Sequence, residues 1–576
     1  MLVRERNAKD FAEAVQRYRA GRLAEAERLC RQLLARAPGH AQALHLLGTI
    51  ALQTGRPADA VAPLASALAQ QPRDGAIHNL LGTAYLQLER HAEAVDSLRT
   101  SIGLDPGRAE AHCALGVALA ALNQSDEAIA AFRASLDLDP DMPQAHFNLA
   151  GLFAARQRGP EAIAHYREVL RLEPDNAVAH HQIGRGLSGQ GDSDAALRHF
   201  REAVRLQPSY IEARHNIGLA LAFAGRWREA LAEFETTLRV EPESGEAHYN
   251  LGSILLLQGL LERGWEQFEW RWNLEGMRPF RRPFLQPQWR GEDIAGQTLI
   301  LHDEQGFGDT LHFCRYAPLA ARRCAKVYLE VHVELVELLR QSFAGDGLEI
   351  LPRTPSFPGI EGLPECDYQS PLLSLPNVFE TGLDTIPAEI PYLRADPEAE
   401  RKWTERLAFL PHPRVGLIWG GRPGHAQDAL RSVALAQLAP LGQIPGVTFL
   451  SLQKGEAASQ LAEPPPGMTI HDFTAELPNF ADTAAFLAAV DLVVTVDTAM
   501  AHLSGALGKP VWMLNRCLPD WRWLLERDDS PWYPTLRQFR QPSHGDWDSA
   551  VAALAAALES WVGTYRAGPV PGADAG

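Results

Sequence analysis

Two stretches of the sequence combine a buried-strand pattern with polar residues placed where a helix begins. In the first, the apolar run Thr298 to His302 leads into DEQGFGDT, which sets Asp309 beside two glycines. An aspartate in such a turn could act as a general base that removes a proton from an attacking hydroxyl, a role that contributes a factor of about 100 to 10,000 in rate. Aspartate is also favoured at helix N-caps, so a capping role for Asp309 is the alternative.

The second stretch, LVVTVDTAMAHLSGALGKPVW at 492 to 512, gives the stronger signal. A buried strand breaks into a helix at Asp497 and Thr498, and the small residues that follow let a ligand approach the backbone. Backbone N–H groups of the first helical turn, around 498 to 501, predict an anion site suited to a nucleotide diphosphate. Asp497 could bind a sugar hydroxyl and His502 could support the diphosphate or Asp497. A core histidine with satisfied hydrogen bonds is the alternative for His502.

Glycine-containing or polar turns follow two further apolar runs. The segment VGLIWGGRPGH at 415 to 425 passes from a strand into a glycine turn, and Gln453 and Lys454 follow the run that ends at Leu452. Such turns can bring backbone against a phosphate, and Arg422 or Arg431 could balance the charge of a leaving group. Ordinary surface loops with ion pairs are the alternative for both turns.

No metal or cofactor is expected. The DxD triplets at 137–139 and 546–548 do not follow strands that would direct them toward a cleft. The sequence therefore predicts metal-independent chemistry, in which positive charge and backbone dipoles stabilise the leaving group.

The elements that precede this chemistry form a repeat array. Seven prolines recur at intervals of 34 residues, which is the period of the tetratricopeptide repeat (TPR). They are Pro38, Pro72, Pro106, Pro140, Pro174, Pro208 and Pro242. Glycine keeps the same period at 48, 82, 116, 184, 218 and 252, and alanine keeps it from Ala26 to Ala230. Each repeat is predicted to be a helix pair that proline terminates.

Beyond the repeats, short apolar runs alternate with helical stretches, which predicts parallel βα units. The six runs are 298–302, 327–331, 415–419, 448–452, 492–496 and 510–514. The predicted fold is thus an α-solenoid followed by a pair of Rossmann-like domains of the GT-B type, in which ligands meet the carboxyl ends of the strands. The segments are a TPR superhelix with an aromatic cap (1–275), a linker (276–297), a first half (298–395), a connector (396–414), a second, nucleotide-binding half (415–562) and a disordered tail (563–576).

Composition restricts the partners. The net charge is −17, which disfavours nucleic acid and anionic membranes. Six cysteines without a CxxC pair argue against structural zinc or disulfides. The charged N-terminus and the lack of a run of about 18 apolar residues predict a cytoplasmic protein without a membrane span.

Five motifs together resemble those of the inverting glycosyltransferases related to lipopolysaccharide heptosyltransferases (family 9), in their TPR-fused bacterial form. They are GWEQFEWRW (264–272), DEQGFGDTLHFCRY (303–316), SLP (374–376), VDTAMAHLSGALGKPVW (496–512) and DWRWLLERDDSPWYP (520–534). The resemblance implies that Asp309 is the base that activates the acceptor. It implies a nucleotide-sugar donor bound by Asp497, Thr498, Ala499, Met500 and His502. The two turns after the apolar runs add Trp419, Gly420, Gly421, Arg422, Gln453 and Lys454 as candidate donor-binding residues. The 422–429 segment departs from the family pattern, with Arg422, Gln427 and Ala429 in place of Asn, Asn and Arg.

The layout also resembles that of the O-GlcNAc transferases, in which a TPR superhelix precedes a GT-B enzyme. Asn148, Gln182, Asn216 and Asn250 share one phase of the repeat and could hydrogen-bond an extended acceptor polypeptide. The resemblance implies transfer of a sugar to Ser or Thr hydroxyls, with flagellin as a candidate acceptor. A scaffold with a degenerate transferase domain, and an enzyme that acts on glycans or lipids, are the alternatives.

Overall fold

The computed structural model describes residues 2–422 and 428–567. The chain divides into two compact units, residues 1–226 and 227–576, and each is considered by itself. The predicted solenoid and the predicted parallel α/β half are both confirmed. The division falls inside the repeat array, before the cap that the sequence predicts at 275.

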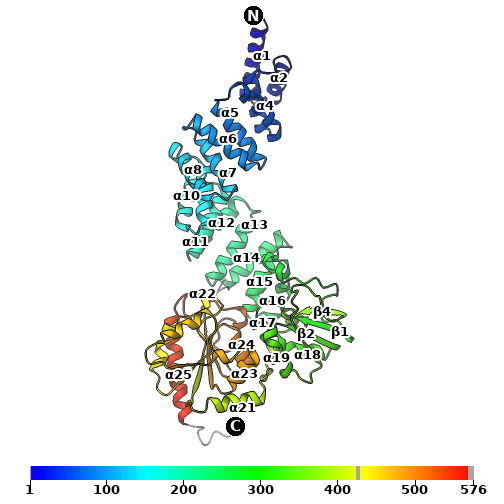
Figure 1. Cartoon of the computed structure of the whole chain (residues 1–576), viewed down its shortest axis with the longest axis vertical. Coiled ribbons are helices and arrows are strands. Elements are labelled where there is room, and N and C mark those ends of the chain that lie inside the picture. The colour runs from blue at the N-terminus through cyan, green and yellow to red at the C-terminus, as the bar shows by residue number, and fades with distance from the viewer. Residues whose placement is uncertain (1, 423–427, 568–576) are drawn as a thin grey trace. The chain divides into compact units, whose positions relative to one another are not determined.

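The first unit consists of paired antiparallel helices that follow one another along the chain (Figure 1). The helices are α1 (Leu2–Arg19), α2 (Leu23–Arg36), α3 (Ala41–Gln53), α4 (Pro57–Gln70), α5 (Gly75–Gln87), α6 (His91–Leu104), α7 (Ala109–Ala121), α8 (Ser125–Leu138), α9 (Pro143–Ala155), α10 (Gly159–Leu172), α11 (Ala177–Gly189), α12 (Ser193–Leu206) and α13 (Ile211–Phe223). The second unit opens with the last helices of the array, α14 (Trp227–Val240), α15 (Gly245–Leu257) and α16 (Leu261–Phe268).

The glycines of the repeat let the two helices of a pair touch. A Cβ atom added to Gly48 would lie 2.5 Å from Leu64 Cγ, and one added to Gly116 would lie 2.7 Å from the Phe132 ring. The periodic alanines are buried at the same contact. Small residues at these positions therefore set the close approach of the helices in each pair.

Each periodic proline lies just after the second helix of a pair, and the carbonyls of five of them accept hydrogen bonds from the next repeat. The Nε2 atoms of four periodic histidines donate to these carbonyls at 2.8 to 3.2 Å, namely His78 to Pro72, His112 to Pro106, His146 to Pro140 and His248 to Pro242. Arg214 donates to Pro208 in the same way, at 3.2 Å. The histidine row thus joins successive repeats and has a structural role.

The turn inside each pair requires a left-handed residue. Glycine occupies it at 21, 55, 191, 225 and 259, with φ between 68° and 83°. Glu89, Asn123 and Gln157 occupy it in three consecutive repeats, with φ of 58° to 60°. Residues other than glycine and asparagine adopt this conformation at a cost, so the turns at Glu89 and Gln157 carry local strain.

The second unit contains two parallel sheets. Their strands are β1 (Ile294–His302), β2 (Cys324–Val331), β3 (Leu348–Pro352), β4 (Tyr368–Pro371), β5 (Arg414–Leu417), β6 (Thr448–Ser451), β7 (Ile470–Asp472), β8 (Leu492–Val496), β9 (Val511–Asn515) and β10 (Leu536–Arg540). The orders are β3-β2-β1-β4 and β10-β9-β8-β5-β6-β7. All six predicted runs are strands, while β3, β4, β7 and β10 are short or carry mixed patterns that gave no clear signal.

Helices flank these sheets (Figure 1). They are α17 (Phe307–Phe313), α18 (Ala317–Ala321), α19 (Val333–Ser342), α20 (Leu375–Val378), α21 (Pro397–Arg406), α22 (Asp428–Arg431), α23 (Phe480–Ala488), α24 (Ala499–Ala506) and α25 (Trp547–Ala567). The last helix continues past residue 562, where the sequence analysis placed the end of the domain; the remaining tail, 568–576, lies outside the described residues.

The last repeat packs on the α/β half through aromatic side chains. The rings of Trp265 and Trp521 meet edge to face at 5.1 Å, and Phe268 lies 5.7 Å from Trp521. Trp265 Nε1 also donates to the Thr381 carbonyl at 2.9 Å. The predicted aromatic cap therefore buries its rings against the α/β half, which explains why the array divides before α14.

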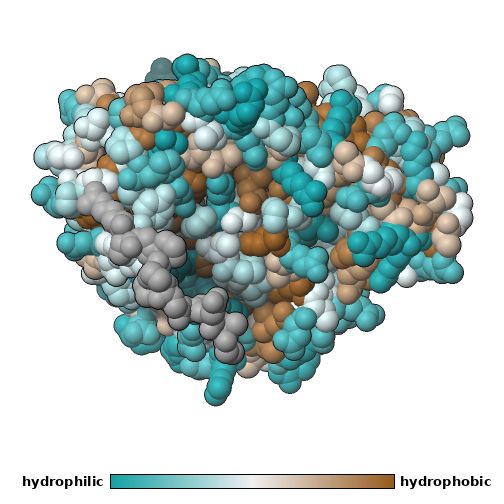
Figure 2. Space-filling model, turned by 90° about the horizontal axis from the view of Figure 1, so that it is seen from below, coloured by the Kyte–Doolittle hydropathy of each residue, from teal (hydrophilic) through white to brown (hydrophobic). Residues whose placement is uncertain are grey.

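The face shown in Figure 2 is mostly hydrophilic, and its apolar side chains form small separate patches. Among the described residues, no helix has both the length and the apolar character that crossing a bilayer requires.

Candidate functional site

The two strand-to-helix turns singled out in the sequence lie at the points where the strand orders reverse. In the first sheet the order turns between β1 and β4, and the turn that carries Asp309 follows β1. In the second sheet the order turns between β8 and β5, and the Asp497 and Trp419 turns follow these two strands. Parallel sheets bind ligands outside the carboxyl ends of their strands at such reversals.

Asp309 is the third residue of α17, and Gly306 is the N-cap. Asp309 Oδ2 accepts a hydrogen bond from the Gly306 N–H at 3.3 Å, so the capping interaction is present although Asp309 is not the cap residue itself. Its other oxygen, Oδ1, lies 2.5 Å from Arg522 Nη2. The carboxylate is thus oriented from both sides, with one-fifth of the side chain exposed.

Arg522, which the sequence analysis did not assign to the site, lies in the 3-10 helix η9 (Trp521–Trp523). Its Nη1 atom contacts Asp520 Oδ1 at 2.8 Å, and its guanidinium stacks over the Trp521 ring at 4.1 Å. Burial alone would lower the pKa of Arg522, but the carboxylates of Asp520 and Asp309 raise it. An arginine between tryptophans in DWRW was the available sequence signal.

The turn after β8 is built around Thr498, the N-cap of α24. Thr498 has an extended backbone, and its Oγ1 accepts from the Met500 N–H at 3.3 Å, while its carbonyl accepts from the Ala501 N–H at 3.0 Å. Within the described part of the chain, the N–H groups of Thr498 and Ala499 have no acceptor. Two of the N–H groups around 498 to 501 are therefore available to an anion.

Asp497 is half-buried immediately before this cap. Burial and the nearby charge of Asp520 raise its pKa, and the charges of Arg431 and Arg522 act in the opposite direction. Asp497 consequently holds a proton more readily than an ordinary aspartate, which reduces its repulsion of a bound anion.

The turns of the two sheets meet at Gly308. A Cβ atom added there would lie 3.1 Å from His502 Cδ2 and 3.6 Å from the Ala499 Cα atom. A larger residue there would have to push the His502 ring aside, so glycine favours the close approach of α17 to α24. Asp309 and the start of α24 therefore belong to one site, although 190 positions separate His312 from His502, whose rings also touch there.

His502 belongs to a buried polar cluster. The Tyr533 hydroxyl lies 3.0 Å from the Nδ1 atoms of both His502 and His312. Burial lowers the pKa of each imidazole well below its ordinary value, so both are neutral. His502 also stacks on Trp523 at 5.2 Å. The cluster fixes the ring of His502 through its Nδ1 side.

The candidate residues after β5 and β6 mainly shape their own turn. Gln453 Oε1 accepts from the N–H groups of Trp419 and Gly420 at 2.9 and 2.8 Å, and its Nε2 donates to the Gly420 carbonyl at 3.0 Å. The Trp419 ring is buried in the core. A Cβ atom on Gly421 would lie 2.2 Å from Asp428 Oδ1 and 2.8 Å from Arg431 Nε, so a larger residue there would displace this ion pair.

The other two candidate donor-binding residues after β5 and β6, Arg422 and Lys454, have different surroundings. Lys454 Nζ donates to the Leu477 carbonyl. Burial lowers the pKa of Lys454, and the charge of Asp482 opposes this shift without cancelling it. Arg422 is exposed. Residues 423–427, which include the rest of the glycine turn and the divergent Gln427, lie outside the described part of the chain.

The candidate acceptor residues occupy different environments. Asn148 Nδ2 is buried without a hydrogen-bond partner in the part of the chain that the structure describes. Gln182 Oε1 accepts from Arg185 Nη1 at 3.3 Å, and Asn216 Nδ2 lies 2.7 Å from His181 Nε2. Asn250 lies in α15, in the other compact unit. Asn148 is therefore the member with an unused hydrogen-bond donor, and a polypeptide can reach that donor only if the side chain rotates outward.

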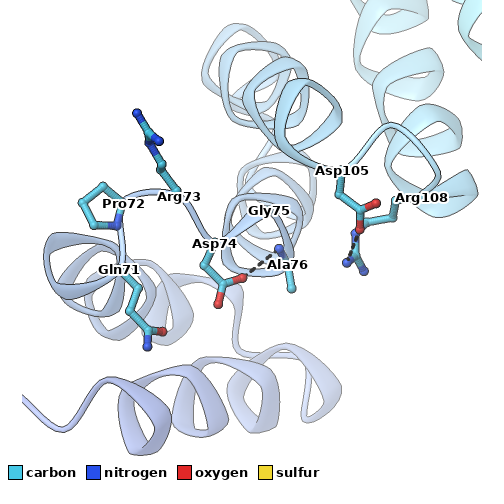
Figure 3. Close-up of a pocket in the computed structure, with 8 residues that line it drawn as sticks. All are labelled: Gln71, Pro72, Arg73, Asp74, Gly75, Ala76, Asp105 and Arg108. Carbon is cyan, nitrogen blue, oxygen red and sulfur yellow. Dashed lines mark hydrogen bonds and ion pairs between the residues drawn. The ribbon is translucent and has the colours of Figure 1, made fainter.

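Two of the cavities formed by the described residues lie away from this site. One, of about 650 Å³, is an open groove between successive repeats, where Asp74 caps α5 and Asp105 pairs with Arg108 (Figure 3). The other, of about 240 Å³, lies beside α16 and is lined by Glu266, Glu269, Gln288, Trp289, Arg290, Ser374, Asn377 and Val378.

The tetratricopeptide repeat family matches residues 11–72, 45–109, 113–177 and 215–268. The chain is a TPR-containing protein. It is similar to protein FlbA of Caulobacter vibrioides, with 29% identity over 321 residues that make up 52% of each chain. The chain thus spans about half the length of this curated relative.

Solved TPR structures align with part of the chain. The Pseudomonas aeruginosa PilF structure is 21% identical, covers 37% of this chain and 97% of its own, and has a TM-score of 0.34. YrrB, described as a TPR protein with an unusual peptide-binding site, is 22% identical, covers 32% of this chain and 95% of its own, and has a TM-score of 0.29.

Proposed function

We propose that the protein is an inverting glycosyltransferase that modifies a polypeptide held by its TPR repeats, with a nucleotide-sugar as donor. The observation that carries the proposal is the meeting of Asp309 with the start of α24 at Gly308. A carboxylate from one parallel sheet and unbonded N–H groups from the other converge at two strand-order reversals. This pairs a general base with an anion site, as transfer from a sugar diphosphate requires.

In the proposed reaction, a Ser or Thr hydroxyl of the acceptor attacks the anomeric carbon of the donor. Its proton passes to the Asp309 carboxylate as the new carbon–oxygen bond forms. The bond from the anomeric carbon to the diphosphate breaks, and the diphosphate leaves with the electron pair. The N–H groups of Thr498 and Ala499 and the neutral His502 stabilise the departing charge, without a metal ion.

The repeats supply the acceptor site in this proposal. Stacked helix pairs form extended surfaces that suit a polypeptide, and the unpartnered amide of the half-buried Asn148 offers one hydrogen bond to its backbone once the side chain rotates outward. Flagellin is the first acceptor to test. The site of action in this proposal is the cytoplasm.

A non-enzymatic scaffold is the second candidate function, and one observation favours it. Both oxygens of Asp309 already have partners, Gly306 N–H and Arg522, before any acceptor is bound. In that case the α/β half would only support the repeats.

The test is intact-mass analysis of proteins that co-purify with the chain, from cells with and without its gene. We expect one or more of them to be heavier by a sugar only when the gene is present. Co-purifying proteins of identical mass in both strains would support the scaffold instead.

A further inference from the structure

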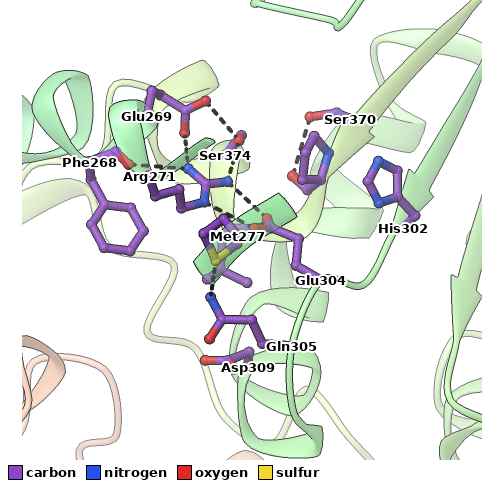
Figure 4. A network of polar contacts seen from close by, with 12 residues as sticks. Phe268, Glu269, Arg271, Met277, His302, Glu304, Gln305, Asp309, Ser370 and Ser374 are labelled. Carbon is purple, nitrogen blue, oxygen red and sulfur yellow. Dashed lines mark hydrogen bonds and ion pairs between the residues drawn. The ribbon is translucent and has the colours of Figure 1, made fainter. Parts of the chain in front are cut away.

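A buried ion pair connects the end of the repeat array to the turn that carries Asp309. Arg271 lies in the 3-10 helix η1 (Glu269–Asn273), which directly continues α16, and its Nε and Nη2 atoms bond the two oxygens of Glu304 at 3.0 and 2.9 Å (Figure 4). The two side chains are 1% and 0% exposed. Glu304 lies in the turn between β1 and α17.

Every donor of the Arg271 guanidinium is used. Beyond Glu304, Nη2 donates to Ser374 Oγ at 2.8 Å, and Nη1 donates to Glu269 Oε1 at 2.7 Å and to the Phe268 carbonyl at 3.5 Å. Glu304 Oε1 also accepts from the Leu373 N–H at 3.2 Å. A planar guanidinium whose five N–H groups are all bonded fixes the position of the Glu304 carboxylate closely.

This network joins residues of three of the five motifs from the sequence. Arg271 and Glu269 come from GWEQFEWRW, Glu304 from DEQGFGDT, and Ser374 from SLP. Glu304 precedes Gly306, the N-cap to which Asp309 bonds. The neighbouring Asp303 is also fixed, since its Oδ1 accepts a hydrogen bond from Arg353 Nε at 2.9 Å. The turn before Asp309 is thus held at two consecutive residues.

Stability alone does not require such a pair. Buried ion pairs lose hydration, and well-packed apolar pairs of similar size are often equally stable or more so. What an apolar pair lacks is direction, because dispersion contacts do not fix the rotation of a turn. The arrangement of Arg271 therefore suits a role in orienting the turn.

We propose that Arg271 is a positioning residue, which acts through Glu304 to hold the turn of Asp309 in the orientation that catalysis needs. The inference rests on the proposed function of Asp309 as a base. It assigns to the end of the repeat array a direct part in building the site, so that the repeats do more than recruit the acceptor.

The test replaces the pair with apolar residues, Arg271→Met together with Glu304→Leu, and compares it with a matched pair. Arg282 and Glu330 form another buried ion pair, with the same exposures of 1% and 0%, which bonds the Gly359 carbonyl and the Thr354 N–H. The control is Arg282→Met with Glu330→Leu. For each protein we measure melting temperature, kcat and KM for sugar transfer, and hydrogen exchange of peptides that span 303–313.

We expect the Arg271 and Glu304 double variant to melt near the wild-type temperature and to exchange faster in 303–313. Its kcat should fall roughly 10- to 100-fold at unchanged donor KM, because small misplacements of a reacting group have effects of this size. The control should keep wild-type kcat and exchange. If the double variant does not fold, Arg271→Lys keeps the charge but not the parallel bonds, and the same three measurements apply.

Wild-type kcat and wild-type exchange in the Arg271 variants would overturn the inference while leaving the proposed function intact. The opposite result would also separate the two claims. In it, the Arg271 variants exchange faster than the wild type in 303–313, but the wild type itself transfers no sugar. It would support the role of Arg271 in ordering the turn and refute the transferase proposal.

Discussion

The anion site proposed at the start of α24 leads to a sharp prediction for Ala499→Pro. Ala499 is the first residue of α24, where proline is favoured because its missing N–H leaves no intrahelical bond unmade. Thr498, the preceding residue, has φ of −142° and ψ of 173°, an extended conformation that a following proline accepts. The substitution therefore removes one unbonded N–H and changes little else.

The size of the effect follows from the bond that is lost. Hydrogen bonds to charged groups contribute about 1.5 to 3 kcal/mol. If the Ala499 N–H donates to the donor diphosphate, affinity should fall by about 10- to 150-fold, since 1.4 kcal/mol corresponds to a factor of ten. The melting temperature should stay near that of the wild type.

Isothermal titration with UDP, GDP and ADP as probes measures the effect. Ala499→Gly keeps the N–H and should bind nearly as the wild type does. Ala177→Pro is the matched control, because Ala177 begins α11 at the repeat position that Pro143 occupies naturally in α9. Unchanged nucleotide affinity in a folded Ala499→Pro variant would refute the assignment of the diphosphate to α24.

Three further predictions concern strain, acceptor binding and pH. Gln157→Gly should raise the free energy of unfolding by about 0.5 to 1 kcal/mol in urea denaturation. The left-handed backbone at φ 60° destabilises a residue with a Cβ atom by more than the greater entropy of glycine destabilises the folded chain. A loss of stability would contradict this. Asn148→Ala should weaken binding of an acceptor peptide about fivefold, one net hydrogen bond of about 1 kcal/mol, and calorimetry that finds equal affinity would place the peptide elsewhere. Asp497 has a pKa above its ordinary value of 3.8, so its ionisation lowers stability as the pH rises past that value. Asp497→Asn should consequently raise the melting temperature more at about pH 7 than at about pH 4, and an equal shift at both pH values would show that the buried charge carries no such penalty.

Periodicity and strand patterns predicted most of the fold. The 34-residue ladders located every helix pair because each ladder has a packing reason, as at Gly48 against Leu64. The six apolar runs located the strands that are buried on both faces. The edge strands β3, β4, β7 and β10 were missed because pairing along a sheet, and not the local sequence, defines them.

The site was predicted in part. Local sequence placed Asp309 and Thr498 on strand-to-helix turns, because both turns consist of an apolar run followed by small and capping residues. Arg522 and Arg271 were missed as site residues, since their partners Asp309 and Glu304 lie far away in the sequence. Conversely, Trp419 and Gln453 follow strands as a ligand-binding residue would, yet hydrogen bonds and burial commit them to the turn itself.

The measurement that tests the central claim most directly is sugar transfer by Asp309→Asn. An asparagine oxygen can still accept from the Gly306 N–H, and Arg522 keeps Asp520 as a partner, so the turn should retain its shape. The amide cannot take up a proton usefully. We predict that transfer, scored by the mass shift of the acceptor, falls by about 100-fold or more while donor and acceptor affinities stay unchanged. Transfer at a near wild-type rate would contradict the account and end the assignment of Asp309 as the base.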